Sequence, residues 1–452
     1  MKNIAIMHYQ VGGTDGVSLE IEKWKLVLES MGHRVHLIAG NLGAGPGTLI
    51  EELYHHRADV ERLSQNTFIE LRDYQNEKEF EKELNELVDV LHKKIKNVLI
   101  DKKIDIVIPN NIWSNSCSPP ASIALARVVR ELGIPTIAHH HDFYWERIDG
   151  VALTCATAVV YADMYMPPRD PNIKHVVINS LAQRDLLARK GIHATVVPNV
   201  FDFDRQAWTR DDYNADFRHR IGLRSNDVMV LQATRIVPKK GIELAVDFVD
   251  ALNNPARRER LREAGLYSGR VFNRDSRIVL VLPGITRDEV TGQYLRRLKQ
   301  KIHNQGVEAL FIEDLIDGHR NEYLGKKLYS LWDTYVYADF VTYPSLWEGW
   351  GNQFLEALRA KLPLVIFEYP VYRADIKGNG FRVLSLGSEV AGTDDLGLVK
   401  VQPQLIEAAA DQAVELLTKP QVRSEMTEYN FALARQNYSL EALRSLLEPL
   451  IG

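Results

Sequence analysis

The sequence contains little cysteine, no long apolar run and no large excess of charge of either sign. Its 452 residues include two cysteines, Cys117 and Cys155, which are too few for a disulfide framework or a cysteine metal site. No stretch approaches the roughly 18 consecutive apolar residues of a membrane-spanning helix, and the opening residues, MKNIAIMHYQ, lack the longer apolar region of a signal peptide. A net charge of −5 gives no general attraction to nucleic acid. These absences predict a cytoplasmic protein with no transmembrane segment and no nucleic-acid partner.

The start of the chain has the pattern of a strand–helix–strand unit. An apolar run from Ile4 to Met7 is followed by a glycine-containing loop, a helical pattern and a second apolar run from Val35 to Ala39. Ser18 is expected to cap the helix. A unit of this kind predicts a parallel sheet.

Two series of apolar, strand-length runs follow one another, with an irregular polar stretch at 202–220 between them. The first series continues at 104–108, 135–138, 175–178 and 195–197, and the second contains 228–232, 278–282, 309–312, 340–343 and 363–367. Because 452 residues exceed what one core normally supports, we predict two doubly wound α/β domains, at residues 1–200 and 201–435. The first is expected to hold a helical insertion at about 47–103, and a final helix at 436–452 is expected to pack back on it. Open α/β sheets bind ligands beyond the carboxyl ends of their strands, so a cleft between the domains is the expected site.

The densest group of functional side chains follows the predicted strand at 340–343. The stretch from Tyr343 to Glu356 reads YPSLWEGWGNQFLE. Its glycines permit close backbone approach, and the N–H groups at the start of a helix near Asn352 suit a phosphate. Glu348 and Glu356, the latter expected on the exposed side of that helix, suit the hydroxyls of a sugar or a ribose. The stretch therefore predicts a ligand with both hydroxyl and phosphate groups, and the alternative is a helix start with an incidental glutamate.

Two cations follow the predicted strand at 228–232. Arg235 and Lys240 lie in the sequence ATRIVPKKG, where they are placed to neutralise a diphosphate. The alternative is a solvated basic turn.

Two segments of the first domain also end predicted strands. The loop from Gln10 to Gly16, QVGGTDG, allows the backbone to approach an anion or a sugar, but it lacks the GxGxxG pattern of dinucleotide sites and is equally typical of a tight turn. The run His139-His140-His141-Asp142 resembles a metal site. Neighbouring side chains on a strand point to opposite faces, so three adjacent histidines do not readily bind one ion. We expect instead a histidine that donates to a substrate hydroxyl.

The segment Asp202-Phe203-Asp204 imitates the metal-binding D-x-D motif of some transferases. It lies in the predicted linker, and we interpret it as a turn or a helix cap. No metal site is predicted from it.

In order and content, these motifs resemble those of retaining glycosyltransferases of the GT-B fold, group 1 (family 4). The signature P-S-x-x-E-G-[FW]-G-x-x-x-x-E-A is matched at every fixed position from Pro344 to Ala357. One place departs from the pattern, because Thr234 precedes Arg235 where the family usually has glycine. The other matching places are Gly12, Gly13, His141-Asp142, Pro198-Asn199, Arg235 and Lys240-Gly241.

The resemblance implies a GT-B fold, with two Rossmann-like domains facing a central cleft, and a role for each motif. Arg235 and Lys240 would bind the donor diphosphate, Glu348 the hydroxyls of the transferred sugar, and Glu356 the ribose. His141 would contact the sugar near its C6 hydroxyl. The implied catalytic residues are therefore Arg235, Lys240, Glu348 and His141, and the implied donor-binding residues are Gly12, Gly13, Gly349, Trp350, Gly351, Asn352, Gln353 and Glu356. Acceptor contacts are expected from loops of the first domain, at Asp15, Asn111, Tyr144 and Arg147.

The expected reaction is transfer of a hexose, with retention at the anomeric carbon, from a UDP- or GDP-sugar to an acceptor hydroxyl. The absence of a long basic amphipathic helix favours a small soluble sugar or sugar acid as the acceptor over a lipid. The family implies no cofactor and no essential metal. Two alternatives stay open, a sugar-nucleotide epimerase of GT-B architecture and a non-catalytic protein that binds nucleotide sugars. Self-association into a homo-oligomer is also left open.

Overall fold

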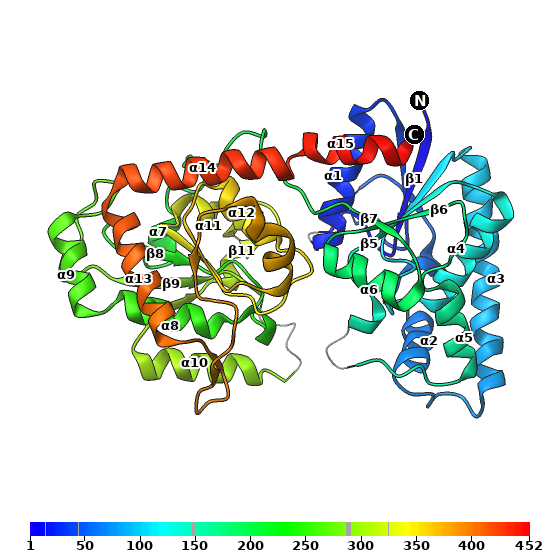
Figure 1. Ribbon diagram of the computed structural model, residues 1–452, viewed down its shortest axis with the longest axis horizontal. Helices are drawn as coiled ribbons and strands as arrows, with labels where there is room; N and C mark the ends of the chain where they lie inside the picture. The colour runs from blue at the N-terminus through cyan, green and yellow to red at the C-terminus, as the bar shows by residue number, and fades with distance from the viewer. Residues whose placement is uncertain (14, 44, 147–149, 286–290, 324) are drawn as a thin grey trace. The chain divides into compact units, whose positions relative to one another are not determined.

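The computed structural model describes residues 1–452 except 14, 44, 147–149, 286–290 and 324. The chain folds into two compact units (Figure 1). Unit 1 consists of Met1–Val200 and Leu440–Gly452, and unit 2 consists of Phe201–Ser439. Of the described helices, none combines the length and the hydropathy that crossing a bilayer requires.

Unit 1 is built on a parallel sheet of seven strands in the order β3-β2-β1-β4-β5-β6-β7. The strands are β1 (Asn3–His8), β2 (Arg34–Ala39), β3 (Thr48–Leu49), β4 (Ile106–Pro109), β5 (Thr136–His140), β6 (Ile173–Val177) and β7 (Ala194–Val196). The helices are α1 (Gly16–Ser30), α2 (Ala58–Phe68), α3 (Glu77–Asp101), α4 (Pro119–Leu132), α5 (Ala156–Tyr165), α6 (Ser180–Lys190) and α15 (Leu440–Ile451), with short turns of helix η1 (Glu51–Leu53) and η2 (Tyr144–Glu146). Because the sheet grows first to one side of β1 and then to the other, the carboxyl ends of β1 and β4 form the switch point at which such sheets bind ligands.

Alternate residues of β1 contribute to two different apolar layers of unit 1. Ile4 and Ile6 pack in one layer with apolar residues of α1 and α15, whereas Ala5 and Met7 pack in the other with residues of α3 and α4. A strand with both faces covered is apolar throughout, which explains the continuous apolar run in the sequence.

The segment expected to be a helical insertion begins with a short strand. β3 pairs with β2 in parallel and so extends the sheet. The rest is helical, and α3 packs on α4 through buried residues spaced three or four apart, which are Phe80, Leu84, Val88, Leu91, Ile95 and Leu99.

Helix α1 is capped by Asp15, and the expectation that Ser18 caps it is wrong. The Asp15 carboxylate accepts hydrogen bonds from the backbone N–H groups of Val17 and Ser18, at 3.1 and 3.0 Å. Ser18 is buried in the first turn and donates its hydroxyl to Asp15 at 2.6 Å. Asp15 has the extended backbone of a cap residue, with φ −71° and ψ 157°, so its side chain reaches the free N–H groups first.

Unit 2 is built on a second parallel sheet, of six strands in the order β10-β9-β8-β14-β15-β16. These strands are β8 (Val228–Leu231), β9 (Ile278–Leu282), β10 (Glu308–Phe311), β14 (Phe340–Tyr343), β15 (Leu364–Ile366) and β16 (Leu384–Ser385). The helices are α7 (Phe217–Arg220), α8 (Ile242–Leu252), α9 (Pro255–Ala264), α10 (Gln293–Gln305), α11 (Leu331–Tyr337), α12 (Asn352–Arg359), α13 (Pro403–Thr418) and α14 (Pro420–Tyr438), with short helical segments η3 (Pro238–Lys240), η4 (Glu313–Leu315), η5 (Tyr372–Ile376) and η6 (Lys377–Asn379). The predicted α/β fold, with parallel sheets in two Rossmann-like domains, is therefore confirmed.

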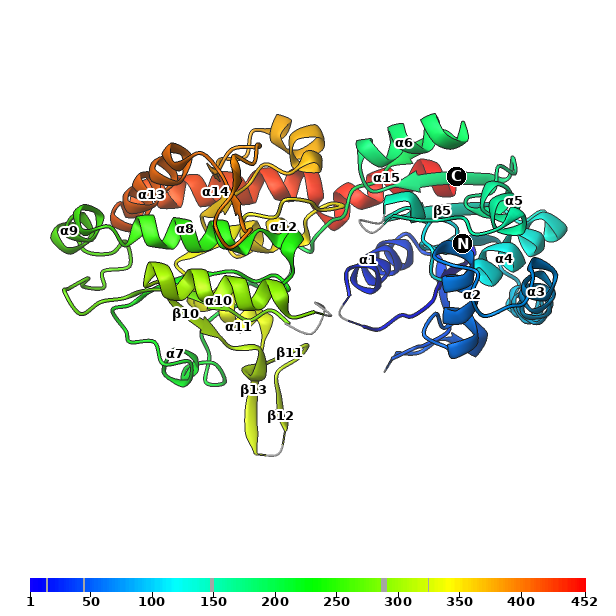
Figure 2. The same ribbon diagram turned by 90° about the horizontal axis from the view of Figure 1, so that it is seen from below.

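Unit 2 also carries small strands that the sequence pattern does not reveal, β11 (Ile316–Asp317), β12 (Asn321–Tyr323), β13 (Lys326–Ser330), β17 (Gly392–Thr393) and β18 (Val399–Lys400). Figure 2 shows β12 and β13 extending away from the rest of the unit. The Tyr213 hydroxyl donates to the backbone oxygens of Asn321 and Leu328, at 2.9 and 2.6 Å. The Lys327 ammonium lies 4.6 Å from the centre of the Tyr213 ring, so this tyrosine fixes the base of the hairpin.

We expect Leu447→Ala to lower the free energy of unfolding by about 2–4 kcal/mol, because Leu447 is fully buried in the apolar layer between α15 and the sheet of unit 1. Urea unfolding followed by circular dichroism measures the change. Ser445→Ala, an exposed position on the same helix, is the matched control and should change stability by less than about 0.5 kcal/mol. Equal stability of the two variants would contradict the packing of α15 on unit 1.

Candidate active site

The loops that follow β8 and β14 meet at the carboxyl edge of the unit 2 sheet, because the two strands are neighbours. The backbone N–H of Leu346 donates to the Lys239 oxygen at 2.9 Å. Gly241 has a φ of +56°, and a Cβ atom there would lie 2.4 Å from the Pro344 oxygen. Only glycine allows this approach, so the two loops are held in one arrangement.

Lys240 and Glu348 form an ion pair where these loops meet. The Lys240 ammonium donates to the Glu348 carboxylate, and the two side chains are 7% and 12% exposed. Burial alone would raise the pKa of Glu348, but the charge and hydrogen bond of Lys240 oppose it and the net pKa lies below the usual value. Glu348 is therefore a carboxylate at neutral pH, and it lies beside the Lys240 side chain.

The helix that follows Glu348 begins at a glycine that no other residue can replace without strain. Gly351 has a φ of +118°, and a Cβ atom there would lie 2.2 Å from the Tyr369 hydroxyl oxygen. That hydroxyl donates to the Trp350 oxygen at 2.7 Å. α12 then starts at Asn352, and its N-cap residue, Gly351, forms no side-chain hydrogen bond to it; the N–H groups of a helix start point back toward the preceding loop.

Two buried hydroxyl groups, those of Tyr343 and Ser345, lie beside this glutamate. Hydrogen bonds from both hydroxyls to the Glu348 carboxylate also lower its pKa. Buried polar groups in folded proteins are normally paired with protein, water or ligand. These hydroxyls, with Gly349 in the loop between Glu348 and Trp350, add polar groups to the edge of the sheet at which the ion pair lies.

Glu356 is buried, at 6% exposure, and its expected place on the exposed side of α12 is wrong. The helix packs against β14 and β15 on one side and against α14 on another, so little of its surface reaches solvent. The Tyr335 hydroxyl donates to the Glu356 carboxylate at 2.8 Å. Burial and then the charge of Glu356 raise the pKa of Tyr335 well above its usual value, so the phenol stays protonated and donating.

Thr234, which stands where the family pattern usually has glycine, is part of a buried chain of hydrogen bonds. Thr342 donates to the Gln232 amide oxygen, and the Gln232 amide nitrogen donates to the Thr234 hydroxyl, each at 2.7 Å. This chain joins the ends of β8 and β14. Arg235 follows with an exposed side chain, in a loop held close by Gly284, whose added Cβ would lie 1.7 Å from the Thr234 oxygen.

The candidate residues of unit 1 lie at the carboxyl ends of β1, β4 and β5. Asn111, with a φ of +55°, donates its amide to Asp142 at 2.6 Å and accepts from the His141 backbone N–H at 2.7 Å. The amide nitrogen and the amide oxygen of Asn111 are thus both used in hydrogen bonds between the loops that follow β4 and β5. Tyr144 is half-buried in η2 with its ring 5.5 Å from that of Phe68, and Arg147 lies outside the described residues.

The three consecutive histidines point to opposite faces of β5. His139 stacks on Trp24 with ring centres 4.2 Å apart, whereas His140 contacts His175 at 3.0 Å between ring nitrogens. Burial lowers the pKa of His141 to about 3, with further lowering by His8 and Lys23, so its imidazole is neutral. Within the described ranges no group of three His, Cys, Asp or Glu side chains is arranged to hold a metal ion.

The D-x-D segment forms a turn. The Asp202 carboxylate accepts from the backbone N–H groups of Asp204 and Arg205, at 3.1 and 2.9 Å. The Asp202 carboxylate therefore stabilises the local turn through these hydrogen bonds, in agreement with the interpretation of the segment as a turn.

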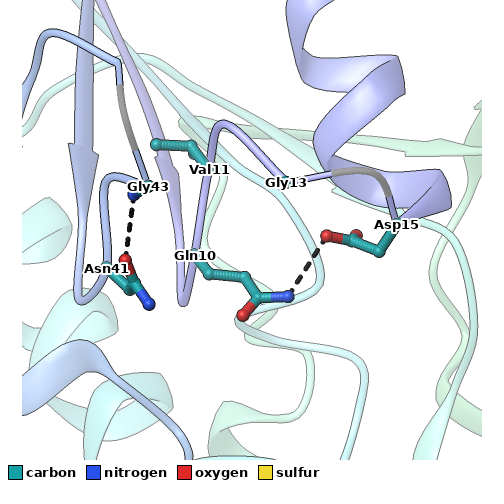
Figure 3. Close-up of a pocket in the computed structure, with 6 residues that line it drawn as sticks. All are labelled: Gln10, Val11, Gly13, Asp15, Asn41 and Gly43. Atoms are coloured by element: carbon teal, nitrogen blue, oxygen red, sulfur yellow. Dashed lines mark hydrogen bonds between the residues drawn. The ribbon is translucent and has the colours of Figure 1, made fainter. Parts of the chain in front are cut away.

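The glycine loop after β1 forms one wall of a pocket in unit 1, shown in Figure 3. Gly13 and Asp15 line the pocket. Gly12 is exposed and does not line the pocket, but it closely approaches the loop after β2, because a Cβ atom there would be 2.8 Å from the Leu42 oxygen. Gln10 and Asn41, which also line this pocket, were not singled out by the sequence patterns.

Comparison with known proteins decides the family of the chain. The pattern of the family "Glycosyl transferases group 1" matches residues 214–432. The mannosylglucosylglycerate synthase of Thermotoga maritima is 38% identical over 98% of this chain and 98% of its own length. The chain belongs to the group 1 glycosyltransferases. Its catalysed reaction is therefore the transfer of a sugar from a donor to an acceptor.

Two further comparisons concern a second sequence relative and the fold. A mannosylglucosylglycerate synthase of Petrotoga mobilis is 39% identical over 92% of this chain and 94% of its own length. The crystal structure of a glycosyltransferase from Rickettsia africae ESF-5 superposes with a TM-score of 0.59 at 16% identity, covering 99% of this chain and 97% of that one. At that identity the similarity shows a shared GT-B fold.

We expect Glu348→Gln to destabilise this glycosyltransferase by up to about 3 kcal/mol at neutral pH, because it leaves the buried Lys240 ammonium unpaired. The folded pKa of Glu348 lies below the usual 4.5. Its contribution to stability is therefore complete above that value and is lost as the pH falls through the lower folded pKa. The difference in unfolding free energy between wild type and Glu348→Gln should shrink in acid. A difference that grows below pH 4.5 would contradict the paired carboxylate.

Proposed function

We propose that this protein is a retaining mannosyltransferase that moves mannose from a nucleoside-diphosphate mannose to a hydroxyl group of glucosylglycerate. The observation that carries the proposal is the buried Lys240–Glu348 pair beside the start of α12. In this proposal Lys240 is the cation that binds the diphosphate, and the neighbouring Glu348 is the carboxylate that binds sugar hydroxyls. The choice of mannose and glucosylglycerate is supported by two relatives named mannosylglucosylglycerate synthase. The acceptor belongs to the small, soluble sugar acids that the sequence favours.

In the proposed donor complex, the diphosphate takes the place of Glu348 as the partner of Lys240. Arg235 and the first N–H groups of α12 contribute further positive charge. Glu348 then accepts hydrogen bonds from hydroxyls of the mannosyl group, and Glu356, oriented by Tyr335, accepts them from the ribose. Lys240 and Glu348 therefore each exchange a partner within the protein for one in the donor, whereas Glu356 keeps its hydrogen bond from Tyr335.

The proposed reaction is a substitution on one face of the anomeric carbon. The bond from that carbon to the diphosphate oxygen breaks as the bond to the acceptor oxygen forms, and the acceptor proton passes to the departing phosphate. Lys240 and Arg235 stabilise the negative charge that develops on the leaving group, since fixed charges need no reorganisation. The negative charge of Glu348 is compatible with the positive charge that develops at the anomeric carbon. The neutral His141 imidazole is assigned a hydrogen bond to a sugar hydroxyl.

The proposed mechanism requires neither a metal ion nor a cofactor, because Lys240, Arg235 and the start of α12 balance the charge of the diphosphate. A donor with either a uridine or a guanosine base satisfies this part of the proposal. The choice between the two bases rests on the assay below.

We expect the purified protein to form a mannosylated glucosylglycerate from GDP- or UDP-mannose, with the α configuration of the donor retained and with full rate in EDTA. Mass spectrometry and NMR of the product measure identity and anomeric configuration. An epimerised nucleotide sugar as the sole product, or donor binding without turnover, would refute the transferase proposal. Inversion at the anomeric carbon would refute the retaining mechanism, and loss of activity in EDTA would refute its independence of a metal ion.

We expect Lys240→Ala to lower kcat/KM by about a hundredfold or more, the usual effect of removing one group that stabilises developing charge. Lys239→Ala is the matched control, because its ammonium lies over the Trp347 ring at 5.4 Å and is assigned no role. Similar losses in both variants would contradict the specific role of Lys240.

We expect Tyr335→Phe to raise the KM for the donor about tenfold, with a smaller change in kcat, because Glu356 loses the hydroxyl that orients it. A donor analogue lacking the ribose 2′-hydroxyl separates orientation from general damage. It should bind wild type and variant with similar affinity, and an equal loss for both donors would contradict a positioning role for Tyr335.

A further inference from the structure

The pocket of unit 1 is small and lies between the loop after β1 and the loop after β2. Its volume is about 240 Å³, and it is lined by Gln10, Val11, Gly13, Asp15, Asn41 and Gly43 (Figure 3). Pockets for drug-sized ligands have volumes of about 300–1,000 Å³. This pocket therefore suits a single sugar ring better than a whole nucleotide sugar.

Backbone contacts hold the two loops together and preform the pocket. The Val11 N–H donates to the Asn41 oxygen at 2.9 Å, and the Gly40 and Asn41 N–H groups both donate to the Tyr9 oxygen, at 3.0 and 3.1 Å. A Cβ atom on Gly43, which has a φ of +55°, would lie 3.1 Å from the Gly12 oxygen. A ligand therefore meets polar groups that are already in place.

Hydrogen bonds within the pocket fix which end of each amide side chain is available. The Asn41 amide oxygen accepts from the Gly43 N–H at 2.9 Å, so its NH₂ group is the end it offers to a ligand. The Gln10 amide nitrogen donates to the Asp15 carboxylate at 3.1 Å, so its oxygen is the end it offers. Figure 3 shows the two amides beside each other. A donor next to an acceptor matches a hydroxyl group, which both accepts and donates.

The charge of Asp15 selects against an anion in this pocket. Burial alone would raise the pKa of Asp15, but hydrogen bonds from Ser18 and Gln10 and the nearby His8 outweigh it and lower the pKa below its usual value. The carboxylate is therefore ionised. It also caps α1 and so neutralises the helix end that otherwise attracts phosphate.

From these contacts we infer that the pocket binds the neutral hexosyl ring of the acceptor, with Gln10 and Asn41 as the residues that recognise its hydroxyls. The carboxylate of a sugar-acid acceptor lies outside the pocket, away from Asp15. This inference rests on the proposed function and names the part of the acceptor that unit 1 recognises.

The test compares binding of glucosylglycerate, methyl glucoside and glycerate by ligand-observed NMR. We expect the hexosyl protons of the first two compounds to receive the strongest saturation transfer and glycerate alone not to compete. Asn41→Asp keeps the oxygen that accepts from Gly43 but replaces the NH₂ donor, and Gln10→Met removes the acceptor at similar size. Each should weaken binding about tenfold, the effect of one lost hydrogen bond of about 1.4 kcal/mol.

Asn76→Asp is the matched control, because Asn76 is also an exposed asparagine whose oxygen accepts backbone N–H groups, those of Lys78 and Glu79. It should bind glucosylglycerate like wild type. Equal binding by wild type, Asn41→Asp and Gln10→Met, or no sugar binding by wild type, would overturn the inference. Sugar binding that depends on Asn41 without any mannosyl transfer would support the pocket and reject the proposed function.

Discussion

The buried pairing of Lys240 with Glu348 is the interaction on which the arrangement of the unit 2 site depends. An unpaired charge at this depth costs several kcal/mol, so the two loops that carry these residues are stable only while each charge has a partner. The loops are accordingly fastened to each other by backbone contacts and by glycines at positions that tolerate no side chain. Under the proposed function, a nucleotide sugar supplies both replacement partners at once, and a ligand with only one of them leaves a charge unsatisfied.

The two units differ in how their strand ends are charged. In unit 2, the Lys240–Glu348 ion pair lies at the sheet edge beside the start of α12, which has no side-chain cap, and under the proposed function this edge receives the anionic donor. In unit 1, Asp15 occupies the start of α1 and burial keeps the imidazole of His141 neutral by lowering its pKa to about 3, which favours neutral hydroxyl groups. Under these proposals, a loop between a parallel strand and a helix receives a neutral ligand where a side chain caps the helix, as at α1, and an anionic one where none does, as at α12.

The sequence predicted the parts of the structure whose signals are local. The end of β14 at Tyr343 and the start of α12 at Asn352 were predicted from that stretch alone, because a proline and two glycines separate the strand from the helix. Tyr335 was missed because its contact with Glu356 joins residues 21 positions apart and a tyrosine among apolar neighbours is typical of a core. For the same reason the burial of Glu356 was not foreseen, since its partner Tyr335 lies on another helix, α11.

Short strands and competing cap residues account for the remaining differences between the predictions from the sequence and the structure. β3 has two residues and β12 three, which is too few for a periodic pattern to be recognised. Asp15 and Ser18 are both good cap residues, and only the backbone conformation decides between them. Gln10 and Asn41 are brought together by pairing of β1 with β2, which the sequence predicts as a sheet but not as a pocket.

The place of α15 in unit 1 has a consequence for the order in which the protein is made. Leu443, Leu447 and Ile451 belong to the same apolar layer as Ile4 and Ile6 of β1. During synthesis on the ribosome, unit 2 has all of its residues before this layer can be completed. Domains generally fold as units, the first one synthesised folding first. In this chain, the first unit to begin folding is therefore the last to finish, and until then it exposes an apolar face to chaperones and proteases.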